Sequence, residues 1–188
     1  MEALLVSTGA VALGEIGDKT QLLALLLAAR FRKPWPIIFG ILVATLANHA
    51  AAGALGAWLM RTLDPLWLRW LLGGSFLAVA LWMLVPDQAG NFERHVPGRL
   101  GVFGLTTVAF FIVEIGDKTQ IATVMLAARF DSLATVVVGT TLGMLVANVP
   151  VVMLGDKAMQ VVPARLVHRI AAAVFAVLGL LVLAGVGV

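Results

Sequence analysis

The chain has 188 residues, of which 61% are hydrophobic and 12% are charged, and its mean hydropathy is +1.04. A soluble domain of this length could not bury that much apolar surface, since charged residues normally make up about a quarter of such chains. The sequence therefore predicts a membrane protein. The balance of 13 Lys and Arg against 10 Asp and Glu does not indicate nucleic-acid binding, and the lack of cysteine excludes disulfides and thiolate metal sites.

Six apolar stretches are long enough to cross a bilayer as helices, which takes about 20 residues each. In chain order they cover residues 3–29, 35–60, 66–85, 101–128, 133–154 and 166–187. The first is not expected to be a cleaved signal peptide, because it has no positive n-region and its apolar run is too long. We therefore predict an all-α membrane protein with six transmembrane helices.

The first stretch holds three ionisable side chains near its middle, Glu15, Asp18 and Lys19, within the sequence EIGDKTQ. In a continuous helix they are spaced i, i+3 and i+4 and share one face. A charge at the bilayer centre costs roughly 2.5–3.5 kcal/mol on insertion scales, so such residues usually face a protein interior and mark a pathway. The alternative is an ion-pair cluster that only joins helices. Gly17 would let another backbone approach, or would let the helix break and free carbonyl groups.

The second stretch carries two further polar residues, Asn48 and His49. Asn48 could supply a carbonyl ligand to a cation. His49 could be a ligand, a proton carrier or a hydrogen-bonded packing residue. In the fifth stretch, Asn148 is a third candidate supporting residue, and His168 in the sixth is interpreted as a solvated loop or span-edge residue.

The fourth stretch repeats the first, because EIGDKTQ recurs 99 positions later. The same offset aligns residues 15–31 with 114–130 without a gap, and it pairs Gly56 with Gly155 and Phe76 with Phe175. We therefore divide one transmembrane transport domain, residues 1–188, into a repeat at 1–86, a linker at 87–99 and a repeat at 100–188. Two copies of the charged motif also make a mere ion-pair cluster a weaker interpretation.

Three helices per repeat would place the second repeat in the membrane with inverted topology, which is typical of secondary transporters. The basic residues of the loops after stretches one, three and five are Arg30, Arg32, Lys33, Arg94, Arg99, Lys157, Arg165 and Arg169. Those on the other side are Arg61, Arg69 and Arg129. The positive-inside rule then predicts both termini outside the cytoplasm. We expect a multi-pass protein of the cell membrane, the inner membrane of a bacterium.

The two motifs together offer oxygen donors for a cation. Their four carboxylates and two lysines leave a net charge of −2 when all are ionised, which one divalent cation or two protons would neutralise. Nearby oxygens come from Thr20, Gln21, Thr119 and Gln120. Oxygen-rich sites suit hard cations such as Ca²⁺ or Mn²⁺.

The duplicated Glu-x-Gly-Asp-Lys-Thr, on the first and fourth of six predicted helices, resembles the Golgi-type Ca²⁺/Mn²⁺:proton antiporter family, which includes bacterial manganese exporters. The resemblance covers nearly the whole chain, and both copies match without departure. It implies that the two motifs face each other as one cation site. The implied metal ligands are Glu15, Asp18, Glu114 and Asp117, with Thr20 and Thr119 in support. Lys19 and Lys118 are further candidate supporting residues, from their place in the motif.

The resemblance also implies a secondary active transporter that exports a divalent cation in exchange for protons. Mn²⁺ is favoured and Ca²⁺ is the alternative. The expected partners are this cation and the lipid bilayer, with no resident cofactor, and the oligomeric state is left open. A passive divalent-cation channel or an amino-acid exporter would be rival transporters. An intramembrane aspartyl protease is disfavoured, because Glu15 and Glu114 stand where its Gly-x-Gly-Asp signature has glycine, so we expect no enzyme.

Overall fold

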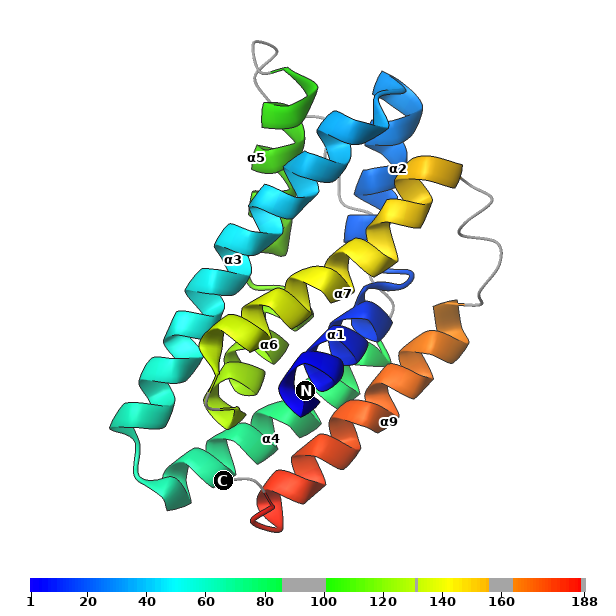
Figure 1. Cartoon of the computed structure of the whole chain (residues 1–188). Helices are drawn as coiled ribbons and strands as arrows, with labels where there is room; N and C mark the ends of the chain where they lie inside the picture. Colours follow the sequence, from blue (N-terminus) through cyan, green and yellow to red (C-terminus); the bar gives the residue numbers. More distant parts are fainter. Residues whose placement is uncertain (86–100, 131, 156–163, 187–188) are drawn as a thin grey trace.

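The computed structural model describes residues 1–85, 101–130, 132–155 and 164–186, and the described chain is all-helical (Figure 1). The linker predicted at 87–99, Lys157 and part of the basic loops lie outside the described residues. The helices are α1 (Glu2–Glu15), α2 (Lys19–Phe31), α3 (Pro34–Thr62), α4 (Pro65–Met83), α5 (Val102–Glu114), α6 (Lys118–Arg129), α7 (Leu133–Leu154) and α9 (Ala164–Leu183).

Four of these helices are long and apolar enough to cross a membrane by themselves: α3, α4, α7 and, from Arg165, α9. They correspond to the second, third, fifth and sixth predicted stretches. Their boundaries have local causes, as α4 shows: Asp64 caps its first turn by accepting a hydrogen bond from the Leu66 N–H at 2.9 Å, and Pro65 supplies a φ suited to the first helical position. Large apolar side chains such as Trp67 and Leu81 stay exposed, as lipid-facing residues do.

The first and fourth predicted stretches are not single helices. The first stretch consists of α1 and α2, and the fourth consists of α5 and α6. Each of these four helices is 12 to 14 residues long. At 1.5 Å per residue, none of the four can cross a hydrocarbon core of about 30 Å alone. The continuous helix through each motif, with its charged residues at i, i+3 and i+4, is therefore wrong. The alternative in which glycine breaks the helix is confirmed.

The helix packing follows the sequence repeat. The 99-residue offset relates α1 to α5, α2 to α6, α3 to α7 and α4 to α9. Accordingly α1 packs on α7 while α5 packs on α3, and α4 packs on α9 (Figure 1). Single contacts are reciprocal as well: a Cβ on Gly139 of α7 would lie 2.9 Å from the Ser7 side chain, and one on Gly40 of α3 would lie 2.7 Å from the Thr106 side chain.

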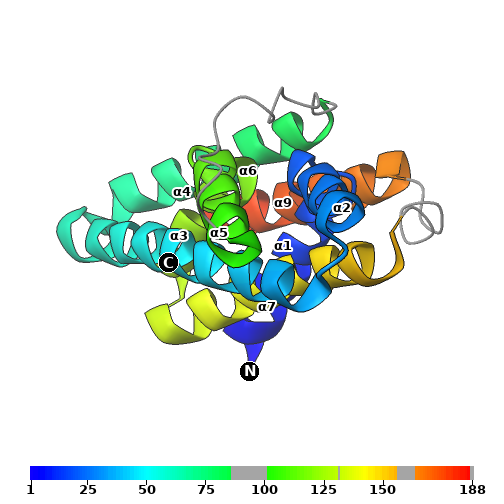
Figure 2. The ribbon, with the colours of Figure 1, turned by 90° about the horizontal axis from the view of Figure 1, so that it is seen from above.

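The centre of the α4–α9 contact is a pair of repeat-equivalent residues. Phe76 and Phe175 are fully buried, and their rings stack with centroids 6.2 Å apart. Gly73 and Gly179 approach each other nearby, since a Cβ on either would lie 3.0–3.2 Å from the carbonyl oxygen of the other. The half-helices α2 and α5 contact each other, and both are seen nearly along their axes in Figure 2 while α3 and α7 run across the view.

Candidate metal centre

Each copy of the motif forms the same tight turn between two half-helices. Ile16 leaves α1 with extended backbone, Gly17 has φ +83°, and Asp18 is extended at the start of α2. In the second copy Gly116 has φ +74°. Only glycine adopts this left-handed conformation without steric cost, so a glycine after Glu-Ile ends the helix. Identical sequence thus gives identical local backbone in both halves.

The glutamine of each motif closes its own turn. Gln21 Oε1 accepts the Gly17 N–H at 2.9 Å, and Gln120 Oε1 accepts the Gly116 N–H at 2.7 Å. Gln21 also donates through Nε2 to the Ala147 carbonyl of α7 at 2.9 Å. These two residues, predicted as oxygen donors beside the cation, therefore act as braces of the helix breaks.

The breaks leave four helix termini at one level of the molecule. α1 and α5 end there, so their last carbonyl groups, at the negative end of each helix dipole, are close to the motif. α2 and α6 begin there with Asp18 and Asp117 as N-cap residues, and Asp117 accepts hydrogen bonds from the backbone N–H and hydroxyl of Thr119 at 3.3 and 3.2 Å. Discontinuous helices of this kind build cation sites in membrane transporters.

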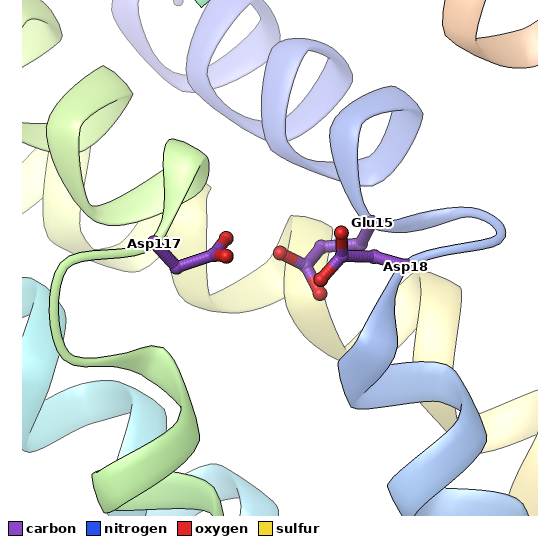
Figure 3. A group of neighbouring side chains, drawn as sticks. All are labelled: Glu15, Asp18 and Asp117. Carbon is purple, nitrogen blue, oxygen red and sulfur yellow. The ribbon is translucent and has the colours of Figure 1, made fainter. Parts of the chain in front are cut away.

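Three buried carboxylates meet between the two breaks. Glu15, Asp18 and Asp117 each offer an oxygen, and these oxygens lie within 4.8 Å of one another. Glu15 and Asp18 lie side by side at the first break, and Asp117 points toward them from the second (Figure 3). All three are at most 1% exposed. Such a cluster of oxygen donors can hold a hard divalent cation.

Two lysines from the motifs cross between the repeats. Lys19 Nζ lies 2.7 Å from Asp117, and Lys118 Nζ lies 3.8 Å from Asp18. The two contacts are reciprocal, since the 99-residue offset exchanges the members of each pair. They are not equal, however: the Lys19 side chain is 25% exposed and that of Lys118 is 1% exposed.

Glu114, the fourth predicted ligand, is held outside this group by α3. The Thr45 hydroxyl donates to one of its carboxylate oxygens at 2.9 Å, and Asn48 Nδ2 donates to the other at 3.2 Å. Asn48 also donates to the Phe111 carbonyl at 3.0 Å, near the end of α5. Glu15 differs, because Thr20 of its own motif donates to it and none of the described residues of the opposing helix α7 does so.

The remaining predicted residues lie close to the motif on α3 and α7. His49 is fully buried, and neither ring nitrogen has a hydrogen-bond partner among the described residues, which does not match the hydrogen-bonded packing interpretation. Asn148 is also fully buried, and its Nδ2 donates to the carbonyl and the sulfur of Met144 at 3.1 and 3.0 Å.

Two site residues were missed at the sequence level. Thr45 lies one helical turn before Asn48 and His49, and this polar spacing within an apolar helix could have identified it. His168 is half-buried, and one ring nitrogen lies 2.9 Å from the Ile16 carbonyl, which the break in the first motif leaves free. His168 lies near the start of α9, at the edge of the span as the sequence indicated, but it is half-buried and not fully solvated. A contact across 152 residues leaves no local signal.

Comparison with known proteins adds independent information. The profile of the family described as "Divalent cation/proton antiporter GDT1" matches residues 3–91 and 102–186, one segment in each half. The chain is 51% identical over 181 residues to a protein of Vibrio cholerae serotype O1 described as "Putative manganese exporter", covering 96% of this chain and 90% of that protein. No solved structure matches the chain.

Proposed function

Because this chain belongs to the divalent cation/proton antiporter family that its two halves match, we propose that it exports Mn²⁺ in exchange for protons. It is a multi-pass membrane transporter and not an enzyme. The observation that carries the proposal is the buried group of Glu15, Asp18 and Asp117, to which both repeats contribute. The resemblance noted from the duplicated motif is confirmed by the family match.

Mn²⁺ is the proposed cargo for two reasons. The donors gathered at the helix breaks are carboxylate and hydroxyl oxygens, which suit Mg²⁺, Ca²⁺ and Mn²⁺. Of these cations, Mn²⁺ is the one named for the relative from Vibrio cholerae, which is similar over almost its whole length. Ca²⁺ is the competing cargo.

The proposed membrane arrangement has six crossings in two inverted repeats. α1 with α2, and α5 with α6, would each cross the bilayer as one broken span, and α3, α4, α7 and α9 would cross as continuous helices. The reciprocal contacts across the molecule, such as the stacking of Phe76 on Phe175, support a two-fold relation between the halves. The cation group then lies near the middle of the membrane.

The proposed orientation places both termini outside the cytoplasm, and it follows from the distribution of basic residues. A single Gly90→Cys substitution tests it, since the chain has no cysteine of its own. In intact cells an impermeant thiol reagent should leave this position unlabelled, and it should label it after the membrane is opened. Labelling from outside the cell would contradict the orientation.

Proton coupling follows from the charge of the site. The four motif carboxylates and two lysines have a net charge of −2 if all are ionised. Burial and like-charge repulsion favour protonation of carboxylates that have lost their cation. If the protein changes its access only when this charge is neutralised, by one Mn²⁺ or by two protons, the two loads exchange. An inward proton gradient would then drive the metal out of the cell.

Purified protein in proteoliposomes provides the test, with Mn²⁺ uptake and internal pH followed in parallel. We expect an imposed pH gradient to drive Mn²⁺ against its concentration gradient, and Mn²⁺ movement to carry protons the other way. Metal flux that ignores the pH gradient and moves no protons would reject antiport in favour of a channel. Liposomes containing Asp117→Asn protein are the matched control.

A further inference from the structure

The helices α3 and α6 pack so closely that their backbones are in contact. A Cβ on Gly56 of α3 would lie 2.1 Å from the Val124 carbonyl oxygen of α6 and 3.0 Å from the Cβ of Ala127. One turn earlier, a Cβ on Gly53 would lie 3.8 Å from the same Ala127 Cβ. Ala127 and Ala128 are 1% and 2% exposed, so no space separates the two helices here.

The repeat-equivalent contact, between the second half of α2 and the end of α7, is open, although the start of α2 contacts α7 through Gln21. A cavity of about 410 Å³ lies there, lined by Leu25, Leu26, Ala28, Ala29, Val152 and Gly155. Among the described residues, a Cβ on Gly155, the counterpart of Gly56, would meet nothing within 4 Å. Leu26 is 56% exposed, whereas its counterpart Met125 is 2% exposed.

The two places are built from the same set of positions. With the 99-residue offset, the six residues that line the cavity correspond one by one to residues of the closed contact and its immediate neighbours. Those counterparts are Val124, Met125, Ala127, Ala128, Gly53 and Gly56. The cavity is therefore the unclosed form of an interface whose closed form is present in the other half of the molecule.

We propose that these are the two gates of the transport cycle: the α3–α6 gate is closed here and the α2–α7 gate is open, and in the opposite state α2 closes on Val152 and Gly155 while α6 leaves Gly53 and Gly56. This inference rests on the proposed transport function. It assigns to four small residues, Gly53, Gly56, Ala28 and Ala127, the role of letting helices meet at backbone distance.

The cation group is coupled to these gates through the moving half-helices. α2 begins at Asp18 and α6 begins at Asp117, so a shift of either half-helix moves one carboxylate of the group. The exposure of the two ion-paired lysines differs in the same way as the two gates do. Lys19, on the half-helix of the open gate, is 25% exposed, and Lys118, on that of the closed gate, is 1% exposed.

The turns at the motifs supply the hinges. Gly17 and Gly116 lie between the half-helices with positive φ, so α2 and α6 are each joined to the rest of their span by a glycine. In the proposed orientation, α2 ends at the cytoplasmic side. The structure is then open toward the cytoplasm, where an exporter loads its metal.

Cysteine pairs can trap each gate, because the chain contains no native cysteine. Gly53→Cys with Ala127→Cys places two Cβ atoms 3.8 Å apart, the mean Cβ separation of disulfides being about 3.8 Å. The end of Leu133 must shift, since it lies 2.6 Å from the new Cβ. The matched pair at the open gate is Val152→Cys with Ala28→Cys. Each single substitution, oxidised in the same way, is the control.

Both pairs should form disulfides in protein that is cycling with Mn²⁺ and a pH gradient, and each disulfide should stop metal flux until a reductant restores it. In protein carrying all four substitutions, intact mass should show one disulfide per molecule, at either gate. Two disulfides in one molecule, or a pair at 28 and 152 that never oxidises, would overturn the proposal.

Thiol labelling supplies a measurement that does not depend on transport or on the tight Gly53 position. In the resting protein, a water-soluble maleimide should label Ala29→Cys faster than its counterpart Ala128→Cys by at least about tenfold, because only an accessible thiolate reacts. Oxidation of the 28–152 pair should make Ala128→Cys reactive. Equal labelling of both positions in the resting protein would overturn the gates. If cross-linking and labelling give the expected results but no Mn²⁺ is transported, the gate proposal is supported and the proposal that Mn²⁺ is the cargo is rejected.

Discussion

The two copies of the EIGDKTQ motif have the same sequence and the same backbone turn, but their glutamates have different surroundings. Glu15 lies with Asp18 and Asp117 in the three-carboxylate group and is hydrogen-bonded by Thr20 of its own repeat. Glu114 is instead held by Thr45 and Asn48 of α3. The difference lies in the opposing helix, and it shows that a duplicated motif need not make a symmetric site.

The residues of α7 that correspond to Thr45 and Asn48 explain this asymmetry. They are Met144 and Ala147, and neither side chain can donate a hydrogen bond to a carboxylate. Glu15 is therefore free of the restraint that α3 places on Glu114, and one of its carboxylate oxygens is buried without a hydrogen-bond partner among the described residues. A buried carboxylate oxygen without a hydrogen-bond donor destabilises the folded protein unless a bound cation contacts it.

The largest expected effect concerns the two aspartates, where the copies should behave alike. Asp18→Asn and Asp117→Asn each remove a charge from the buried group and break the ion pair with a lysine of the other motif. Each should weaken Mn²⁺ binding by at least about 100-fold, beyond the 10–100-fold that loss of an outer-shell partner costs, and should abolish transport. Isothermal titration and flux in proteoliposomes measure the two quantities. Normal transport by either variant would place the site elsewhere.

Substitution of the two glutamates should have different effects in the two copies of the motif. Glu15→Gln should weaken Mn²⁺ binding by about 100-fold, whereas Glu114→Gln should weaken it by about tenfold, within the range for a residue behind the ligands. Both changes should stop proton-coupled transport, since each removes one of the four carboxylates that balance the charge. Titration of the two variants side by side provides the measurement. Equal losses in affinity would mean that Glu114 joins the group when metal binds.

The helix that opposes each glutamate offers a further contrast. Thr45→Val combined with Asn48→Leu removes both hydrogen bonds to Glu114 and should reduce metal transport by about 10–100-fold. Met144→Leu, at the position equivalent to Thr45, preserves volume and should change transport little. Initial rates of Mn²⁺ uptake measure both. A larger loss from Met144→Leu would show that its sulfur contributes to the site.

Substitution of a hinge glycine should lower the stability of the protein. Gly116→Ala puts a side chain at φ +74° where the space around it is open, so the expected destabilisation of about 1–2 kcal/mol comes from backbone strain alone. Gly74→Ala, in the exposed face of α4 and also without close neighbours, is the control and should be neutral or stabilising. Thermal unfolding in detergent measures both. No difference between the two variants would contradict the strain argument.

The smallest expected effect concerns His168, which braces the first break but has no like counterpart at the second. Replacing His168 with Phe removes its hydrogen bond to the Ile16 carbonyl and should cost about 1 kcal/mol of stability. The equivalent residue, the half-buried Arg69, lies over the Trp70 ring at 5.8 Å. Arg69→Gln should cost less than the loss of the His168 hydrogen bond, because a cation–π contact that is not fully desolvated contributes about 0.5–1 kcal/mol. The same unfolding assay compares them, and the reverse order would remove His168 as a brace.

The sequence by itself determined the features that depend on composition and on local backbone. Four of its six apolar stretches predicted the long membrane helices, because about 20 residues without charged side chains have no better environment than lipid. The 99-residue repeat predicted the motif pair, and the glycine in each copy allowed the helix break, since the left-handed conformation is a property of that residue. The family resemblance, which the profile match confirms, also came from these local residues.

Only the tertiary structure decided which carboxylates meet and which gate is closed. Glu114 is separated from the other three by hydrogen bonds from α3, and His168 reaches Ile16 across 152 residues. The spacing of polar residues in α3 marks Thr45 but not its partner, and the His168 contact has no local signal. The open α2–α7 contact and the closed α3–α6 contact are built from equivalent positions. Because the two repeats have equivalent residues at both contacts, the sequence permits either contact to close. The cation group links α2 and α6, the two half-helices that would have to move, so long-range packing decides which of the two contacts is closed.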